Sequence, residues 1–246
     1  MVRLTSLVIW HDVECAAYDV DLPLWRELAD EASGPILDIG CGTGRVALDL
    51  ADHGHDVTGL DSEPSFTAAL AARARAHGLR VRAETADARS FTLAGRTFAL
   101  AIVPMQVAQL LGGAYGRAAM LASVRRHMQP GGRLAVALAD PLDGVPEYEE
   151  QLPPLPDVLE TRGWVYSSVP VEVRMEDGAT AIERLRQAVS PTGELDESVA
   201  TIRLDRVGPD ELEAEAGQDW TVCPRREVPG TIDYVGSAVV VLEARP

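Results

Sequence analysis

The stretch ILDIGCGTGRVALDLADHGHDVTGLD, residues 36–61, decides the fold of this chain. It begins with a short apolar run, passes through closely spaced glycines, and ends in a second apolar run that Asp61 closes. Residues 43–53 carry apolar side chains at helical spacing. The order predicts a strand, a glycine-rich turn, a helix and a second strand, which is the βαβ unit of nucleotide-binding α/β proteins.

The glycines at positions 40, 42 and 44 give this unit its chemistry. Glycine lets the backbone pass close to a ligand in conformations that other side chains disfavour. The helix that follows directs free N–H groups to the same place, and Asp61 can accept hydrogen bonds from both hydroxyls of a ribose. The sequence therefore predicts a nucleoside-containing cofactor.

A nicotinamide dinucleotide is the less favoured cofactor. The dinucleotide fingerprint has a third glycine where this chain has Arg45. The chain also contains no Lys, so the Tyr-x-x-x-Lys pair of many such oxidoreductases is absent. A sulfonium nucleoside needs no pyrophosphate cradle, and Asp38, at the end of the first strand, would face its positive charge.

Strands and helices alternate from residue 35 to residue 140, which predicts a parallel sheet with helices on both faces. We expect a doubly wound, mostly parallel seven-strand α/β fold. The expected organisation is an N-terminal helical lid at 1–34, a cofactor-binding domain formed by 35–162 and 208–246, and an antiparallel β insertion at 163–207.

The insertion is expected from period-two patterning between Trp164 and Val207. A turn signal at 190–193 separates two of its strands. The pattern predicts a three-stranded antiparallel sheet that can roof the active site or form a dimer contact. Residues 141–160, rich in Pro, Asp and Glu, are expected to form a loop or lid.

The amino-acid composition argues against several classes of binding partner and cofactor. The net charge of −16 disfavours nucleic acid and anionic membrane surfaces, because both repel an acidic protein. The absence of Lys excludes pyridoxal-phosphate chemistry and a Walker-type phosphate loop. Three cysteines without paired spacing give no metal-cluster pattern, and no secretion signal or membrane span is evident. These features predict a cytoplasmic protein that binds a small molecule.

The segment Asp38-Ile39-Gly40-Cys41-Gly42-Thr43-Gly44 resembles the signature of class I S-adenosylmethionine-dependent methyltransferases of the small-molecule type. The resemblance extends over roughly residues 18–140, through Asp61, Thr85-Ala86-Asp87-Ala88 and Met128-Gln129-Pro130-Gly131-Gly132. It implies S-adenosyl-L-methionine as the cofactor and a Rossmann-like methyltransferase fold.

The resemblance also assigns the cofactor-binding residues. It places the glycine turn against the methionine part of the cofactor, Asp61 against the ribose, and Asp87 against the adenine amino group. Residues around Val103 would line the methyl-transfer cleft. The expected cofactor-binding set is Asp38, Gly40, Cys41, Gly42, Asp61, Ser62, Asp87, Ala88 and Val103.

Departures from the family pattern exclude two subclasses. The fourth strand ends in Val-Pro-Met-Gln, residues 103–106, without the Asn/Asp-Pro-Pro-aromatic motif of enzymes that methylate nucleobase amino groups. The metal-dependent catechol-type members use an Asn ligand, and this chain has no Asn. We therefore expect no bound metal.

Methyl transfer needs few diagnostic side chains, because the enzyme mainly aligns the acceptor with the methyl group and excludes water. The catalytic candidates are Tyr18, His11 and Gln106. Tyr18 could face the sulfonium or orient the acceptor, His11 could be a general base, and Gln106 could bind the acceptor. Gln109 could do the same, and the alternative for both glutamines is a helix-capping or solvent-facing amide.

The sequence thus predicts transfer of a methyl group to an O or N atom of a small molecule, by proximity and desolvation, with general-base help as an option. One alternative is a protein of this fold repurposed as a cyclase or regulator. A nicotinamide-dependent oxidoreductase is the less favoured alternative. A homodimer is compatible with the sequence.

Overall fold

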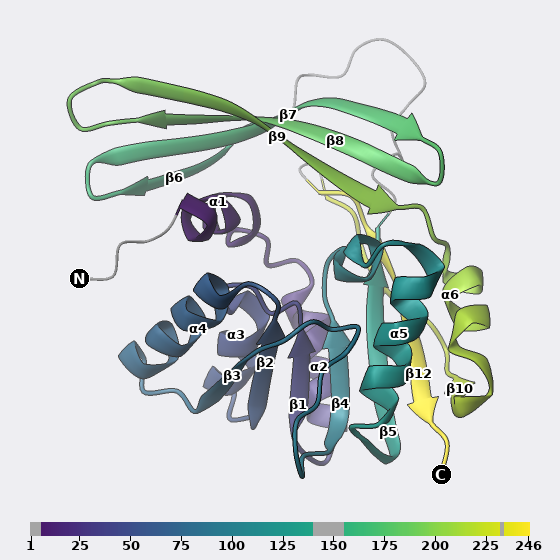
Figure 1. Ribbon diagram of the computed structural model, residues 1–246. Coiled ribbons are helices and arrows are strands. Elements are labelled where there is room, and N and C mark those ends of the chain that lie inside the picture. The colour runs from purple at the N-terminus through teal and green to yellow at the C-terminus, as the bar shows by residue number, and fades with distance from the viewer. Residues whose placement is uncertain (1–5, 140–154, 232–233) are drawn as a thin grey trace.

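The computed structural model describes residues 6–139, 155–231 and 234–246. Its core is a twisted sheet in the strand order β10-β12-β5-β4-β1-β2-β3, with β11 also paired to β12 (Figure 1). Strands β1 to β5 are mutually parallel, and β12 runs antiparallel to β5. The central strands are β1 (Ile36–Ile39), β2 (Val57–Asp61), β3 (Val81–Thr85), β4 (Phe98–Val103), β5 (Met128–Leu138) and β12 (Ser237–Ala244).

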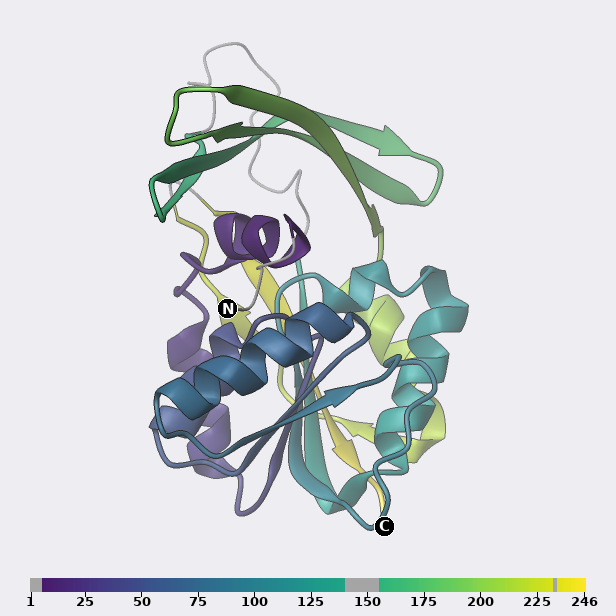
Figure 2. The ribbon, with the colours of Figure 1, turned by 60° about the vertical axis from the view of Figure 1, so that its left-hand side comes forward.

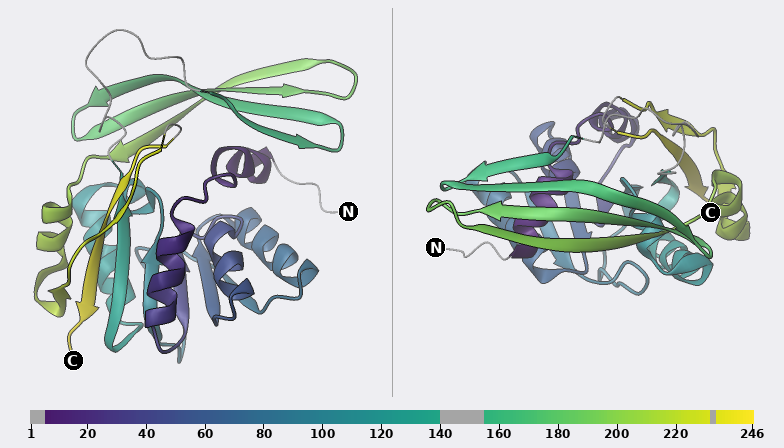
Figure 3. Two further views of the ribbon diagram at one scale, coloured as in Figure 1. Left: turned by 180° about the vertical axis from the view of Figure 1, so that it is seen from behind. Right: turned by 90° about the horizontal axis from the view of Figure 1, so that it is seen from above.

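Helices cover both faces of this sheet, as the alternation predicted. Two of them, α2 (Leu22–Glu31) and α3 (Arg45–Asp52), pack with part of α4 (Pro64–Ala76) in one apolar layer. On the other face, α5 (Gly113–Arg125) and α6 (Pro209–Ala216) form the second layer. The view from behind shows α2 lying across the sheet (Figure 3). The seven-strand, doubly wound α/β fold is thus confirmed.

The inner strands are apolar along their length because both faces are covered. All four residues of β1 are buried, and five of the six in β4. Burial on both faces removes the alternation that a half-exposed strand shows. This is why residues 36–39 and 98–103 could be recognised as strands from sequence.

A second, antiparallel sheet has the order β6-β7-β8-β9. Its strands are β6 (Asp157–Thr161), β7 (Trp164–Glu176), β8 (Ala179–Val189) and β9 (Leu195–Asp205). It has four strands where the sequence predicted three. The additional strand, β6, lies largely in the segment expected to be a loop. It was missed because five residues next to an acidic segment are too few to show a period-two pattern.

The edge of the main sheet also differs from expectation. From sequence, residues 220–228 and 235–244 are expected to form two closing strands, but the structure divides the first of them into β10 (Trp220–Val222) and β11 (Arg226–Val228). These two pair with opposite halves of β12 and so occupy one edge position. The expected lid at 141–160 lies largely outside the described residues, which resume at Leu155.

The second sheet lies above the carboxyl ends of the parallel strands, with α1 (Ser6–Cys15) between them (Figure 2). Seen from above, its long hairpins extend across the core (Figure 3, right). Of the segment expected to form an N-terminal lid, α1 lies beneath the second sheet whereas α2 packs on the main sheet, and the role of α1 as a lid stays a prediction. Among the described residues, no helix is both long enough and apolar enough to cross a membrane.

Candidate cofactor and acceptor site

The glycine turn forms the floor of the candidate site. Gly40 and Gly42 have φ angles of 69° and 53°, in the left-handed region that favours glycine. A Cβ at Gly42 would lie 2.2 Å from His11 Nε2, and one at Gly40 would lie 2.5 Å from Val107 Cγ2. Both glycines are therefore required by conformation and by close approach, as their spacing predicted.

Asp61 is placed at the end of β2 beside this turn. Its Oδ2 accepts a hydrogen bond from the Gly42 N–H at 2.9 Å, and its Oδ1 accepts one from the Glu63 N–H at 2.9 Å. A carboxylate has further lone pairs for additional donors. Asp61 thus fixes the turn and keeps acceptor capacity for the ribose hydroxyls that the sequence assigned to it.

Asp38 lies at the end of β1, buried beneath the same turn with 1% of its surface exposed. Neither carboxylate oxygen has a hydrogen-bond partner among the described residues. Burial raises the pKa of Asp38 to about 7, against the opposing effect of the Arg45 guanidinium. A buried acid without a donor costs free energy unless a ligand supplies one, so the cradle fits a cofactor that carries an ammonium and a sulfonium.

Two members of the expected cofactor set direct their side chains away from the turn. The Cys41 side chain is buried against Gly59 of β2, and burial raises the pKa of its thiol far above the ordinary range. The Val103 side chain is wholly buried in the core between the sheet and α5. Either residue can therefore meet a cofactor only through its backbone.

The residues expected near the adenine and ribose lie on the rim. Asp87 binds Arg89 through both oxygens, and this interaction holds the pKa of Asp87 below its ordinary value. Ala88 is nearly buried and Ser62 is exposed. An adenine amino group would have to share Asp87 with the Arg89 guanidinium, so that assignment stays a prediction.

His11 lies on the cofactor side of the site. Its ring stands over Gly42 and packs against Phe66, with ring centroids 4.6 Å apart. Burial lowers the pKa of His11, so the imidazole is neutral. The Thr43 hydroxyl donates its only hydrogen to Asp12, so the 3.4 Å contact with His11 Nδ1 requires a proton on Nδ1. This leaves Nε2 as an acceptor above the glycine turn.

Tyr18 and Gln106, the other two catalytic candidates, lie together at the carboxyl end of β4. They line a small hollow of about 50 Å³ with Met105, Tyr234 and Ser237. The Tyr18 and Tyr234 rings meet edge to face at 4.9 Å. Burial raises the pKa of Tyr18 to about 12, so its hydroxyl can donate a hydrogen bond but cannot serve as a base near neutral pH. Tyr18 and Gln106 therefore share one hollow, and His11 is not among its lining residues.

A larger cavity of about 690 Å³ adjoins this hollow and shares Ser237 with it. Its acidic side chains come from α6 and β11 and include Glu211 and Glu227, with Arg206 as a basic neighbour. Its volume suits a small molecule. Within the described ranges no cluster of three or more residues could hold a metal ion.

Gln109 belongs to the frame of this cavity. Its amide donates to the carbonyl oxygens of Ala139, at 2.8 Å, and Asp205, at 3.2 Å, and its Oε1 accepts from the Ala139 N–H. These bonds join the end of β5 to the end of β9. The Gln109 amide is thus buried and bound to backbone, and the expectation of a helix-capping or solvent-facing amide is wrong for this residue.

Two residues at the site, Asp12 and Arg73, had no sequence signal of their own, and they hold Thr43 from α1 and α4. Tyr234, which from sequence could enter the substrate pocket or simply belong to a turn, joins Tyr18 from the loop before β12. Arg45, at the place of the missing fingerprint glycine, donates to both oxygens of Asp21. These contacts join segments far apart in the chain, so only the helical spacing of their own segments could be seen in advance.

Comparison with known proteins gives a family for the central part of the chain. Residues 36–132 match the model of a family described as a methyltransferase domain. Over 54 residues the chain is 43% identical to an uncharacterized RNA methyltransferase of Parasynechococcus marenigrum. That match covers 22% of this chain and only 12% of the relative, so it says nothing of the relative's remaining domains.

Solved structures resemble the whole chain. A S-adenosylmethionine-dependent methyltransferase from Clostridium acetobutylicum has a TM-score of 0.73 at 13% identity and covers 97% of each chain. An amino pentose methyltransferase from Micromonospora echinaspora has a TM-score of 0.70 at 21% identity over 99% of each chain. A sugar N-methyltransferase from Streptoalloteichus has a TM-score of 0.68 at 20% identity, over 99% of this chain and 88% of the other. At these identities the likeness establishes a shared fold.

Proposed function

Residues 36–132 match a methyltransferase domain family and the whole chain shares the fold of such enzymes, and we propose that the chain is a class I S-adenosylmethionine-dependent methyltransferase that methylates a small molecule at an N or O atom. The observation that supports this most directly is Asp38. A buried carboxylate without a donor, next to Asp61 and beneath left-handed glycines, is complementary to the cationic end of S-adenosylmethionine. The cofactor supplies an activated methyl group.

The residues of this chain would divide the work between two sides of the site. Asp38, the glycine turn and Asp61 would hold the cofactor, with His11 above Gly42. Tyr18 and Gln106 would orient the acceptor, because they line the hollow next to the larger cavity. Rate enhancement would come from alignment and exclusion of water, and no described metal-ligating cluster enters the proposal.

Amino sugars are the acceptor class to test first. Two of the structurally similar proteins are named as an amino pentose methyltransferase and a sugar N-methyltransferase. The acidic residues Glu211 and Glu227 on the cavity wall are compatible with a cationic amine. A bound ammonium would first release one proton to solvent, and the neutral nitrogen would then attack the methyl group as the bond from methyl to sulfur breaks. Tyr18, whose pKa is raised to about 12, would not accept that proton near neutral pH.

The deciding experiment is calorimetric titration with S-adenosylmethionine, S-adenosylhomocysteine and NAD⁺, followed by transfer of labelled methyl groups to amino sugars and their hydroxyl analogues. We expect both adenosyl ligands to bind and NAD⁺ not to bind. Asp61→Ala should weaken binding by about tenfold or more, because a hydrogen-bonded charge is lost. If neither adenosyl ligand binds, the proposal fails. If both bind but no acceptor is methylated, the repurposed-protein alternative gains support.

We also propose that two copies of the chain associate through the outer face of the second sheet. Strand register places Val165, Val189 and Leu195 in one row across three strands. A polar row, Ser167, Gln187 and Glu197, separates it from a second apolar row that contains Leu185 and Val199. Leu195 is 56% exposed and Val199 is 61% exposed. Exposed apolar side chains gathered on one face mark association sites, and a second copy offers the same surface in return.

A further inference from the structure

Helix α1 lies between the second sheet and the glycine turn, and it contacts both (Figures 1 and 2). Trp10 and Glu14 are four residues apart and share one face of the helix, whereas Asp12 lies about half a turn away on the opposite face. One face makes polar contacts with the glycine turn and α4, and the other makes polar contacts with the second sheet. Together these contacts link the insertion to the proposed cofactor site.

The face toward the core holds the glycine turn. Asp12 Oδ1 accepts from the Thr43 hydroxyl at 2.7 Å and from the Arg73 guanidinium at 3.0 Å. Arg73 also donates to the Thr43 carbonyl at 3.3 Å. Thr43 stands between two glycines of the turn, and His11 covers Gly42. The position of α1 therefore determines both how Thr43 is held and whether His11 covers Gly42.

The opposite face of α1 is held by the second sheet. Glu14 accepts from Arg186 Nε at 2.7 Å, from Arg186 Nη2 at 2.8 Å and from the Ser168 hydroxyl at 2.7 Å. The Arg186 guanidinium also lies over the Trp10 ring, 5.3 Å from its centroid. The Glu14 side chain is only 9% exposed, and that of Arg186 is 20% exposed. A bidentate pair at this depth has a fixed geometry.

Glu14 stays ionised despite its burial. Burial by itself raises the pKa of this carboxyl, but hydrogen bonds from Arg186 and Ser168 and the charges of Arg186 and Arg184 outweigh it, so that the pKa is lowered. Removal of Arg186 would leave a buried carboxylate with much less compensation. The Glu14 carboxylate would regain contact with water if α1 moved away from the second sheet.

We infer that Glu14 and Arg186 are positioning residues for cofactor binding: their ion pair holds α1 down so that Asp12 and His11 close the glycine turn. Neither residue touches the turn itself. The inference rests on the proposed cofactor site, and it makes the affinity of that site depend on an arginine in the β insertion.

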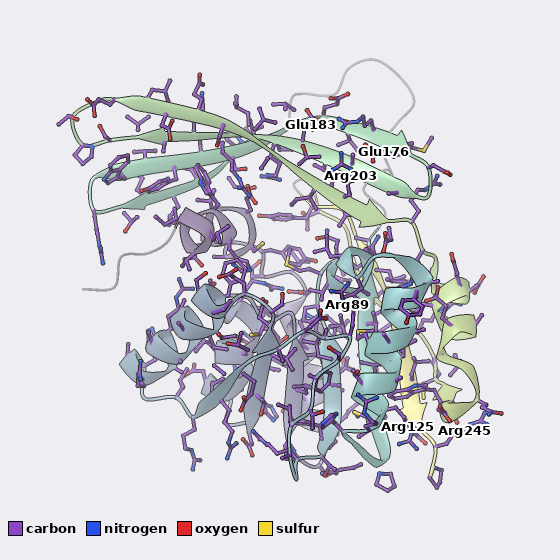
Figure 4. The ribbon with its side chains drawn as sticks, in the orientation of Figure 1. Arg89, Arg125, Glu176, Glu183, Arg203 and Arg245 are labelled. Atoms are coloured by element: carbon purple, nitrogen blue, oxygen red, sulfur yellow. The ribbon has the colours of Figure 1, made fainter. Side chains whose placement is uncertain are left out.

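The test compares Arg186→Met with a matched variant of the same sheet, Arg203→Met. Arg203 donates to Glu176 at 3.0 Å on the outer face, in the half of the sheet that does not lie over α1 (Figure 4). The affinity for S-adenosylhomocysteine is measured by calorimetry and the fold is checked by thermal unfolding. We expect Arg186→Met to weaken binding about tenfold or more and Arg203→Met to change it by less than about twofold.

Two further measurements separate positioning from general destabilisation. Hydrogen exchange in Arg186→Met should become faster in α1, at residues 6–15, and stay unchanged in α3. Arg186→Lys, which keeps a charge but loses the bidentate geometry, should have an affinity between those of the wild type and Arg186→Met. If Arg186→Met does not fold, the affinity of Arg186→Lys is compared with that of the wild type instead.

The outcomes distinguish the inference from the proposed function. If the wild-type protein does not bind S-adenosylhomocysteine, the cofactor site itself is wrong. If the wild type binds and Arg186→Met binds equally well, only the positioning role is overturned. Equal weakening by Arg203→Met would likewise overturn it, because the effect would then not depend on α1.

Discussion

At the scale of single residues, Asp38 shows the cost that a binding site imposes on its protein. Its carboxyl is buried, has no hydrogen-bond partner in the part of the chain that the structure describes, and has a pKa raised to about 7 by burial. Asp61, twenty-three positions later and only partly buried, is satisfied by two backbone N–H groups. The two acids end neighbouring strands of one sheet, yet only Asp38 needs a ligand to compensate it.

Asp38→Asn should stabilise the protein at alkaline pH and abolish cofactor binding. The folded pKa of about 7 lies above the ordinary 3.8. The contribution of this group to stability is therefore fully present below about pH 4 and is lost as the pH rises through 7. The variant should gain on the order of 1–4 kcal/mol over the wild type at pH 8 and less at pH 5. Urea unfolding at both pH values measures this.

The matched control is Asp56→Asn, since Asp56 is 52% exposed in a surface pair with Arg82. It should change stability little at either pH. An identical pH dependence in the wild type and Asp38→Asn would contradict the raised pKa.

Gly42→Ala should impair cofactor binding more than it impairs folding. Its φ of 53° and the contact with His11 mean that an added Cβ strains the backbone and displaces the imidazole. We expect about 1–2 kcal/mol of destabilisation and a loss of S-adenosylhomocysteine affinity of about tenfold or more. Thermal unfolding and calorimetry measure the two effects.

Gly54→Ala provides the comparison, because Gly54 has a φ of 94° with no atom within 4 Å of the added Cβ. It should cost similar stability and leave affinity unchanged. Equal affinity losses in both variants would argue against a specific role for the Gly42 backbone.

At the scale of elements, the predictions held best where a segment's pattern reflects its own burial. The helices α3, α4 and α5 and the inner strands lie within a few residues of the expected ranges. Strands β6 and β11 were missed or merged, because they are five and three residues long and are held by pairing with a neighbour. Their pairing partners, not their own residues, make them strands.

Gln109 joins two such elements, so replacing it tests the connection. Gln109→Met removes the bonds to both backbone groups of Ala139 and leaves them buried without partners. We expect the free energy of unfolding to fall by roughly 2–4 kcal/mol, as measured with urea. Gln106→Met, three residues earlier and only partly buried, should change it by less than about 0.5 kcal/mol. A small effect at position 109 would show that the connection does not depend on this amide.

At the scale of the whole molecule, the insertion is a roof held over the core by α1 and joined to it at the ends of β9 and β5. One face of the roof is polar and meets α1 through Arg186 and Ser168. The other face carries exposed apolar side chains such as Leu195 and Val199 at one end, and ion pairs such as Arg203–Glu176 at the other. The proposed contact between two copies therefore concerns the apolar end of this face.

Val199→Glu should convert the proposed dimer into a monomer. The side chain is 61% exposed in the described chain, so the charge costs the monomer little but would be buried between two copies. Sedimentation velocity should give a dimer for the wild type and a monomer for the variant. Thr201→Glu, on the same face but outside the apolar rows, should remain a dimer. A monomeric wild type would overturn the proposal.

The sequence by itself determined the α/β core, the glycine turn and the acids Asp38 and Asp61, because a strand, a tight turn and a helix each impose a local pattern on their residues. It also placed a β insertion after the fifth strand. Only the tertiary structure decided that His11 lies over the glycine turn, that Tyr18 and Gln106 line one hollow with Tyr234, and that Glu14 pairs with Arg186 across 172 positions of chain. Contacts between distant segments depend on how elements pack, and packing leaves no periodic signal in either segment alone.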